Sequence, residues 1–157
     1  MGGSVLTKIK LIEDKQSNLE VQIRYPAMNA YVKQLIFKIK SLDIKIIGSD
    51  GEKNILLNVD DVFYIECIER KTFIYTQEGV YRSSKKLYQL FDDLKEFGFV
   101  QISKSCILNM NELDYVKILF NSRLEATLTN GEKVIITRKY IPVVKDWLDK
   151  GGDFHDE

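Results

Sequence analysis

From Ile44 onward, the chain is a succession of short β-type runs separated by turn signals, and this pattern limits the fold more than any other feature. Two of the breaks are strong turn signals, Ser-Asp-Gly at residues 49–51 and Asn-Gly at residues 130–131. The predicted strands, rich in β-branched and aromatic residues, are 44–48, 54–59, 62–68, 72–76, 80–82, 99–103, 106–108, 115–120, 124–128 and 134–136. The pattern predicts a mainly β (α+β) domain over residues 44–150 with short helices.

The first 43 residues carry a different pattern, which predicts a strand-strand-helix segment. Apolar residues alternate partly over 5–13 and regularly over 19–25, and the polar stretch 14–18 between them favours a turn. Three- and four-residue apolar spacing then predicts a helix from Met28 to Leu42, with Pro26 at its first turn. We expect this segment to serve in dimerisation.

Two more helices are expected within the β-rich part. One is capped by Ser83 or Ser84 and ends at Gly98, and the other runs from about Lys139 to Lys150. Residues 151–157 form a polar tail. Three regions result: 1–43, 44–150 and 151–157.

Composition excludes several functional classes. Twenty-three cations balance 23 carboxylates, so the total charge does not indicate nucleic-acid binding, but residues 69–86 hold five cations against two carboxylates, a net charge of +3. No apolar run approaches the ~20 residues that span a bilayer and no export signal is evident, so we expect a cytoplasmic protein. Two distant cysteines and one histidine predict no metal site, and without a nucleophile–histidine pair or phosphate-binding glycine loop we expect no enzyme activity and no cofactor.

The stretch from Val100 to Asn109 is the clearest candidate for a functional site. A cation, Lys104, and the hydroxyls of Ser103 and Ser105 interrupt two apolar β-type runs. This arrangement suits a grip on a phosphate backbone, yet it also suits a polar hairpin corner, and the stretch alone leaves both interpretations open.

Three spaced motifs together resemble the LytTR family of bacterial DNA-binding domains. They are DDVFYIE at residues 60–66, FGFVQISKSCILN at 97–109, and LTNG at 128–131 followed by VIITRKY at 134–140. The resemblance covers about residues 44–150. The sequence departs from the family pattern at Gln101, Ser103, Cys106 and Thr137, and the serine at 103 removes a common histidine.

The resemblance implies an elongated domain of three β-sheets that reads duplex DNA through loops set into successive major grooves. It assigns DNA contact to Asn109 and Arg138, and to the corner that contains Arg70 and Lys71. The residues themselves add Lys104, Ser105 and Lys139 as phosphate ligands, and the arginine fork of Arg138 matches the guanine edge. The candidate DNA-binding residues are Arg70, Lys71, Lys104, Ser105, Asn109, Arg138 and Lys139, with Lys85, Lys86 and Arg123 as weaker candidates.

The resemblance also points to the stand-alone members of the family, because no receiver-domain pattern precedes residue 44. It therefore implies a transcriptional regulator with double-stranded DNA as partner, a homodimer, and a membrane protein as a candidate partner, with no small-molecule substrate. The alternative is a β module that binds a ligand or a protein. An even distribution of surface charge would favour that alternative, and a one-sided basic surface would count against it.

Overall fold

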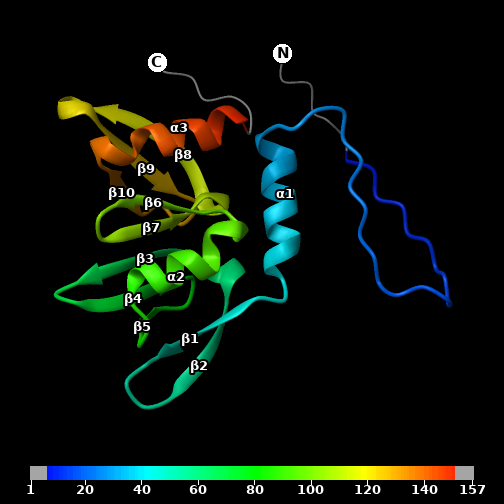
Figure 1. Cartoon of the computed structure of the whole chain (residues 1–157), viewed down its shortest axis with the longest axis horizontal. Helices are drawn as coiled ribbons and strands as arrows, with labels where there is room; N and C mark the ends of the chain where they lie inside the picture. The colour runs from blue at the N-terminus through cyan, green and yellow to red at the C-terminus, as the bar shows by residue number, and fades with distance from the viewer. Residues whose placement is uncertain (1–6, 151–157) are drawn as a thin grey trace.

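The computed structural model describes residues 7–150 and shows a mainly β body with three short α-helices (Figure 1). The helices are α1 (Ala30–Ser41), α2 (Leu87–Leu94) and α3 (Ile141–Lys150). The strands are β1 (Lys45–Ser49), β2 (Asn54–Asn58), β3 (Val62–Ile68), β4 (Lys71–Thr76), β5 (Val80–Ser83), β6 (Phe99–Ser103), β7 (Cys106–Asn109), β8 (Leu113–Leu119), β9 (Arg123–Leu128) and β10 (Lys133–Ile136). The mainly β prediction is therefore confirmed, and ten strands lie where the turn signals divide the sequence. Among residues 7–150, no helix is both long and apolar enough to cross a membrane.

The strands form two antiparallel sheets. The larger sheet has the order β2-β1-β5-β4-β3-β7-β6, and the smaller has the order β10-β9-β8. The resemblance implied three sheets, whereas the structure has two. The number differs because one residue pair, Ser49 opposite Arg82, joins β1 to β5 and so adds the β1–β2 hairpin to the larger sheet. The β1–β2 hairpin is thus attached weakly to the five strands beside it.

The β6–β7 hairpin lies at the centre of the body and is covered on both sides. On one side Val100, Ile102 and Leu108 pack with the small sheet and α3, whose Val144 is fully buried. On the other side Ile107 packs with the apolar face of α2. Each large apolar side chain buried in this way stabilises the fold by about 1.5–3 kcal/mol, so the hairpin is held rigidly at its base.

The helix boundaries differ in part from those predicted. The side chain of Asn29 accepts a hydrogen bond from Val32 N (2.9 Å), so α1 begins after Asn29 and not at Pro26. Lys86 occupies the cap position of α2, while the Ser83 hydroxyl accepts from Lys85 N, outside the helix. Helix α2 ends at Leu94 and not at Gly98; the 3₁₀ turn η2 (Lys95–Phe97) follows it, and Gly98 ends that turn with a left-handed backbone (φ 91°).

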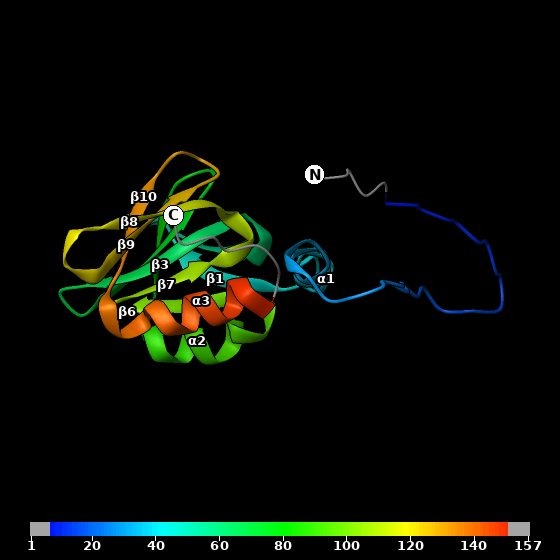
Figure 2. The same ribbon diagram turned by 90° about the horizontal axis from the view of Figure 1, so that it is seen from above.

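The two N-terminal strands are a wrong prediction over the residues that the structure describes. Residues 7–25 form two extended arms joined by a turn at Asp14, whose carbonyl accepts from Ser17 N (3.2 Å), but no strand ladder links them. The arms project beside α1 and cover no sheet (Figure 2). The alternating apolar side chains of the arms are not buried within one chain, since Leu11 is 91% exposed and Leu19 is 98% exposed. The start of the first predicted strand, residues 5 and 6, lies outside the described residues.

Helix α1, in contrast, packs against the body, where it contacts α3 and the turn that contains Asn111. The Phe37 ring stacks on Trp147 of α3 at 6.4 Å between centroids, and Lys33 donates to the Trp147 carbonyl (3.2 Å). Gln34 donates to the carbonyl of Asn111 (3.0 Å). The helix thereby fixes the base from which the two arms extend.

Candidate nucleic-acid interface

Three loops that are distant in sequence lie together at one end of the large sheet. The β3–β4 turn adjoins the β6–β7 turn because Cys67 N donates to the Ser105 carbonyl (2.8 Å). The 3₁₀ turn η5 (Arg138–Tyr140) adjoins the same β6 end because Thr137 N donates to the Ile102 carbonyl (2.9 Å). The ends of both hairpins and the start of α3 lie at the left edge of the molecule in Figure 1. The structure thus brings together the loops that carry six of the seven candidate residues.

The β3–β4 turn presents Arg70 on an unusual backbone. Glu69 (φ 51°) and Arg70 (φ 67°) both adopt left-handed conformations, as a tight two-residue hairpin turn requires. Glycine and asparagine are the usual residues there, since other side chains are strained in this region. Arg70 and the next residue, Lys71, are both exposed. The turn therefore holds a long cation at a fixed, outward position.

The β6–β7 turn presents Lys104, and the unusual serine beside it helps to shape the loop. The Ser103 hydroxyl accepts from Ser105 N (3.2 Å), and the Gln101 side chain donates to the Ser103 carbonyl (3.0 Å). Two positions at which the sequence departs from the family pattern thus stabilise the turn from within. Lys104 and Ser105 are left exposed between the two arms of the hairpin.

The turn η5 carries the remaining two cations. Thr137 anchors it through its amide and also through its hydroxyl, which donates to the Ile102 carbonyl (3.4 Å). Arg138 and Lys139 are exposed, and the Lys139 ammonium lies 5.6 Å from the centroid of the Tyr140 ring. Thr137 therefore fixes the start of the turn, and the exposed guanidinium of Arg138, the next residue, can contact a base edge.

Asn109 does not lie with the other candidates. It ends β7 at the opposite end of the hairpin from Lys104, opposite Phe99, and is only 2% exposed. Its amide nitrogen donates to the Val62 carbonyl (2.9 Å), and its side-chain oxygen accepts from Asn111 N (3.1 Å). Both ends of this side chain are occupied within the fold, so we leave Asn109 out of the proposed interface.

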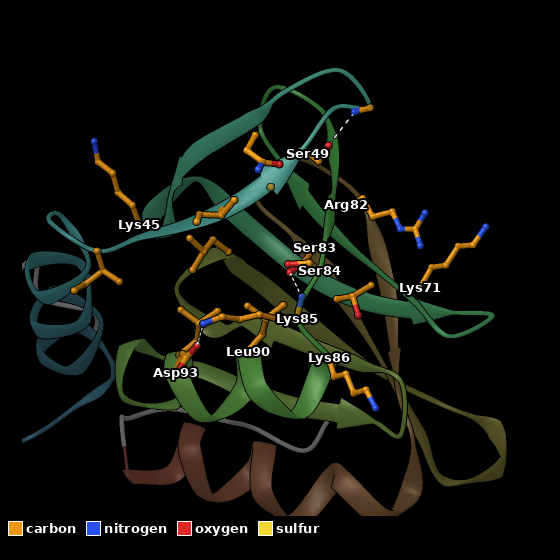
Figure 3. Close-up of a pocket in the computed structure, with 18 of the residues that line it drawn as sticks. Lys45, Ser49, Lys71, Arg82, Ser83, Ser84, Lys85, Lys86, Leu90 and Asp93 are labelled. Carbon is orange, nitrogen blue, oxygen red and sulfur yellow. Dashed lines mark hydrogen bonds and ion pairs between the residues drawn. The ribbon is translucent and has the colours of Figure 1, made fainter.

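Two open hollows extend the cationic area across the large sheet. One, of about 960 Å³, lies between the β1–β2 hairpin, β5 and the start of α2 (Figure 3), and the other, of about 530 Å³, includes Lys104 and Ser105. Arg70 and Lys86 line both hollows, so the two lie next to each other. In Figure 3, Lys71, Arg82 and Lys86 extend outward on the same side.

Arg82 was not among the predicted candidates, and Lys86 was a weak one. The register of β4 and β5 sets Arg82 opposite Phe73, and Lys71 lies two residues from Phe73 on the same face. The predicted hairpin over residues 72–82 did not contain this signal, because its expected turn at 77–79 would set Arg82 opposite Ile74, and a register shift of one residue moves a side chain to the other face of the sheet. Lys85 differs, since its ammonium pairs with Asp93 (2.8 Å).

We call the following set the basic surface. It comprises Arg70, Lys71, Arg82, Lys86, Lys104, Arg138 and Lys139. Within residues 7–150, none of these seven side chains forms an ion pair with a carboxylate. Their charge is therefore directed at solvent, as an anion-binding surface requires. The net charge of zero does not reveal this surface, because most carboxylates lie elsewhere in the chain; Glu69, in the turn with Arg70, is an exception.

Comparison with known proteins identifies the family and the fold. The profile of the LytTr DNA-binding domain matches residues 52–149. A solved structure, the LytTr DNA-binding domain of a putative methyl-accepting/DNA response regulator from Bacillus cereus, superposes with a TM-score of 0.63 at 20% identity, covering 66% of this chain and 95% of that one. At this identity the superposition shows the shared fold.

Two curated relatives cover different shares of the chain. The Sensory transduction protein LytT of Enterococcus faecalis is 30% identical over 109 residues, which are 69% of this chain and 44% of LytT, so the match spans less than half of that protein. An uncharacterized HTH-type transcriptional regulator of Staphylococcus aureus (strain MSSA476) is 24% identical over 139 residues, or 87% of this chain and 94% of that protein. With a family match over well more than half of its residues, the chain belongs to the LytTR family of DNA-binding domains.

Proposed function

We propose that this protein is a sequence-specific transcriptional regulator that binds duplex DNA in the major groove through its three clustered loops. The observation that carries the proposal is the convergence of Arg70, Lys104 and Arg138 on one end of a rigid sheet, with no carboxylate paired to any of them. Two-stranded hairpins can enter the major groove, which is about 12 Å wide. A regulator of this kind acts where the chromosome is, which in a bacterium is the cytoplasm.

The loops divide the work between bases and backbone. Arg138 lies on the short turn that β6 anchors, and its planar fork can donate to O6 and N7 of one guanine. Lys104 and the Ser105 hydroxyl suit phosphate oxygens, as do Lys71 and Arg82 on the adjoining strands. Phosphate contacts position the protein, and base contacts supply the sequence preference.

The proposal is tested by selecting bound duplexes from a random library and measuring their affinities by fluorescence anisotropy over a salt series. Binding should weaken steeply with salt, and the selected duplex should bind more tightly than random DNA. Arg138→Ala should cost about 1–3 kcal/mol on the selected duplex and relax the preference at one base pair.

The matched control is Lys40→Ala, which removes an exposed cation from α1, away from the basic surface. It should bind the selected duplex as the unaltered protein does. If selection yields no common sequence, the regulator proposal fails. If Arg138→Ala and Lys40→Ala bind equally well, the assigned role of Arg138 fails.

A further inference from the structure

The second N-terminal arm, residues 19–25, is extended and has the residue alternation of a β-strand, yet it has no partner strand within residues 7–150. Its apolar residues alternate on one face, and Leu19 (98%), Val21 (59%) and Tyr25 (45%) are largely exposed. A strand with this pattern and unpaired backbone groups is a template for pairing with another strand. Within one chain the arm extends away from the body, where no sheet edge meets it (Figure 2).

The polar face of the same arm is self-complementary. Glu20, Gln22 and Arg24 share this face, and the Gln22 amide donates to the Glu20 carboxylate. When two copies run antiparallel about a two-fold axis through Gln22, Glu20 of each copy lies opposite Arg24 of the other. The same register sets Val21 opposite Ile23 and Leu19 opposite Tyr25, so apolar residues meet apolar residues.

Other registers lose this match. A register shift of one residue sets polar residues opposite apolar ones, because side chains alternate with period 2. A shift by two keeps the faces but sets Glu20 opposite Gln22, or Glu20 opposite Pro26, and separates the opposite charges. The Gln22-centred register is therefore the one that matches both faces.

We infer that residues 19–25 form a homodimer interface in which the arms of two copies pair antiparallel about Gln22. The exposed arm pairs with the same arm of a second copy of this chain, so both copies contribute the same residues and the interface is isologous. The inference goes beyond DNA binding and does not depend on it. One consequence is that α1, which carries each arm, would set the spacing between the two bodies.

Charge reversal tests the inference on the full chain without DNA, by sedimentation equilibrium. The unaltered protein should show a concentration-dependent species of twice the 18.2 kDa chain mass. Glu20→Lys or Arg24→Glu alone sets like charges opposite at two symmetric places, and we expect the dimer dissociation constant to rise about tenfold, equivalent to about 1.4 kcal/mol. The double variant E20K/R24E restores opposite charges and should return close to the original value, and Arg24→Lys is the charge-preserving control.

Cross-linking tests the register itself. Gln22→Cys places two sulfurs opposite each other across the two-fold axis, so mild oxidation should give a disulfide-linked dimer at high yield. Glu20→Cys and Arg24→Cys should cross-link poorly, because each lies opposite a different residue, and the unaltered protein gives the background of Cys67 and Cys106. The inference is overturned if the unaltered protein stays a monomer up to its solubility limit, if the double reversal does not rescue, or if positions 20, 22 and 24 cross-link alike.

Discussion

Replacing Asn109 by alanine should separate folding from DNA binding. The side chain joins two parts of the body: its nitrogen donates to the Val62 carbonyl at the start of β3, and its oxygen accepts from the amide of Asn111. Val62 is fully buried and Asn111 is 4% exposed, so water cannot easily replace either bond. The variant leaves one acceptor and one donor without partners.

The size of the effect follows from those two groups. Each buried polar group that loses its partner costs about 1–3 kcal/mol, so for two groups the free energy of unfolding should fall by roughly 2–6 kcal/mol. Since a domain of this size is stable by about 5–15 kcal/mol, the variant should still fold at low temperature. Its folded form should bind DNA with the affinity of the unaltered protein, because the basic surface is at the other end of β7.

Urea unfolding followed by circular dichroism measures the loss of stability, and anisotropy at low temperature measures DNA binding by the same preparation. Asn54→Ala is the matched control: this exposed asparagine on β2 should change stability by less than about 0.5 kcal/mol. A variant of Asn109 with unaltered stability and DNA affinity reduced by about 1–3 kcal/mol would refute the structural assignment and restore Asn109 to the DNA contacts.

Three further results are expected. Lys104→Ala should reduce the salt dependence of DNA binding by about one unit of slope while leaving the sequence preference intact, as titration at several salt concentrations would reveal. Thiol reagents should modify Cys67 before Cys106 between about pH 7 and 9, because burial raises the pKa of the Cys106 thiol and keeps its reactive thiolate scarce. Mass spectrometry of the labelled native protein measures the order, and Cys106 labelled first would contradict the prediction. Gly98→Ala should lower the unfolding free energy by at least about 1–2 kcal/mol, since the glycine has φ 91° and a Cβ would lie 2.8 Å from Asn111 Nδ2; unchanged urea unfolding would count against the left-handed end of this segment.

The β-rich body could be predicted because its signals are local. Turn residues such as Asn130-Gly131 and Ser49-Asp50-Gly51 divide the strands where the structure divides them, and the three spaced motifs identified the family. The exposed cations of the site were also predictable, since loops at hairpin ends carry them. What connects the loops, such as the bond from Cys67 to Ser105, depends on strand order and was not evident from local sequence.

The errors have a common physical cause, because they concern groups whose role depends on a distant partner. Asparagine favours turns and DNA contacts alike, and the local sequence does not reveal that both ends of the Asn109 side chain have partners within the fold. Alternation over residues 19–25 does predict strand character, but a ladder needs a second strand that the described part of one chain does not supply. The caps of α1 and α2 shifted by a few residues because several polar residues compete at each start.

At the left-handed turn formed by Glu69 and Arg70, the residues that would best stabilise the fold differ from those that would best bind DNA. A sequence chosen for folding alone would have Asn-Gly there, and each L-residue with a side chain forgoes about 1–2 kcal/mol in that conformation. Glu69→Asn with Arg70→Gly should therefore raise the resistance of the protein to urea and weaken its hold on DNA. Engineering for thermostability and engineering for operator affinity would select opposite residues at this apex, a local conflict between stability and activity.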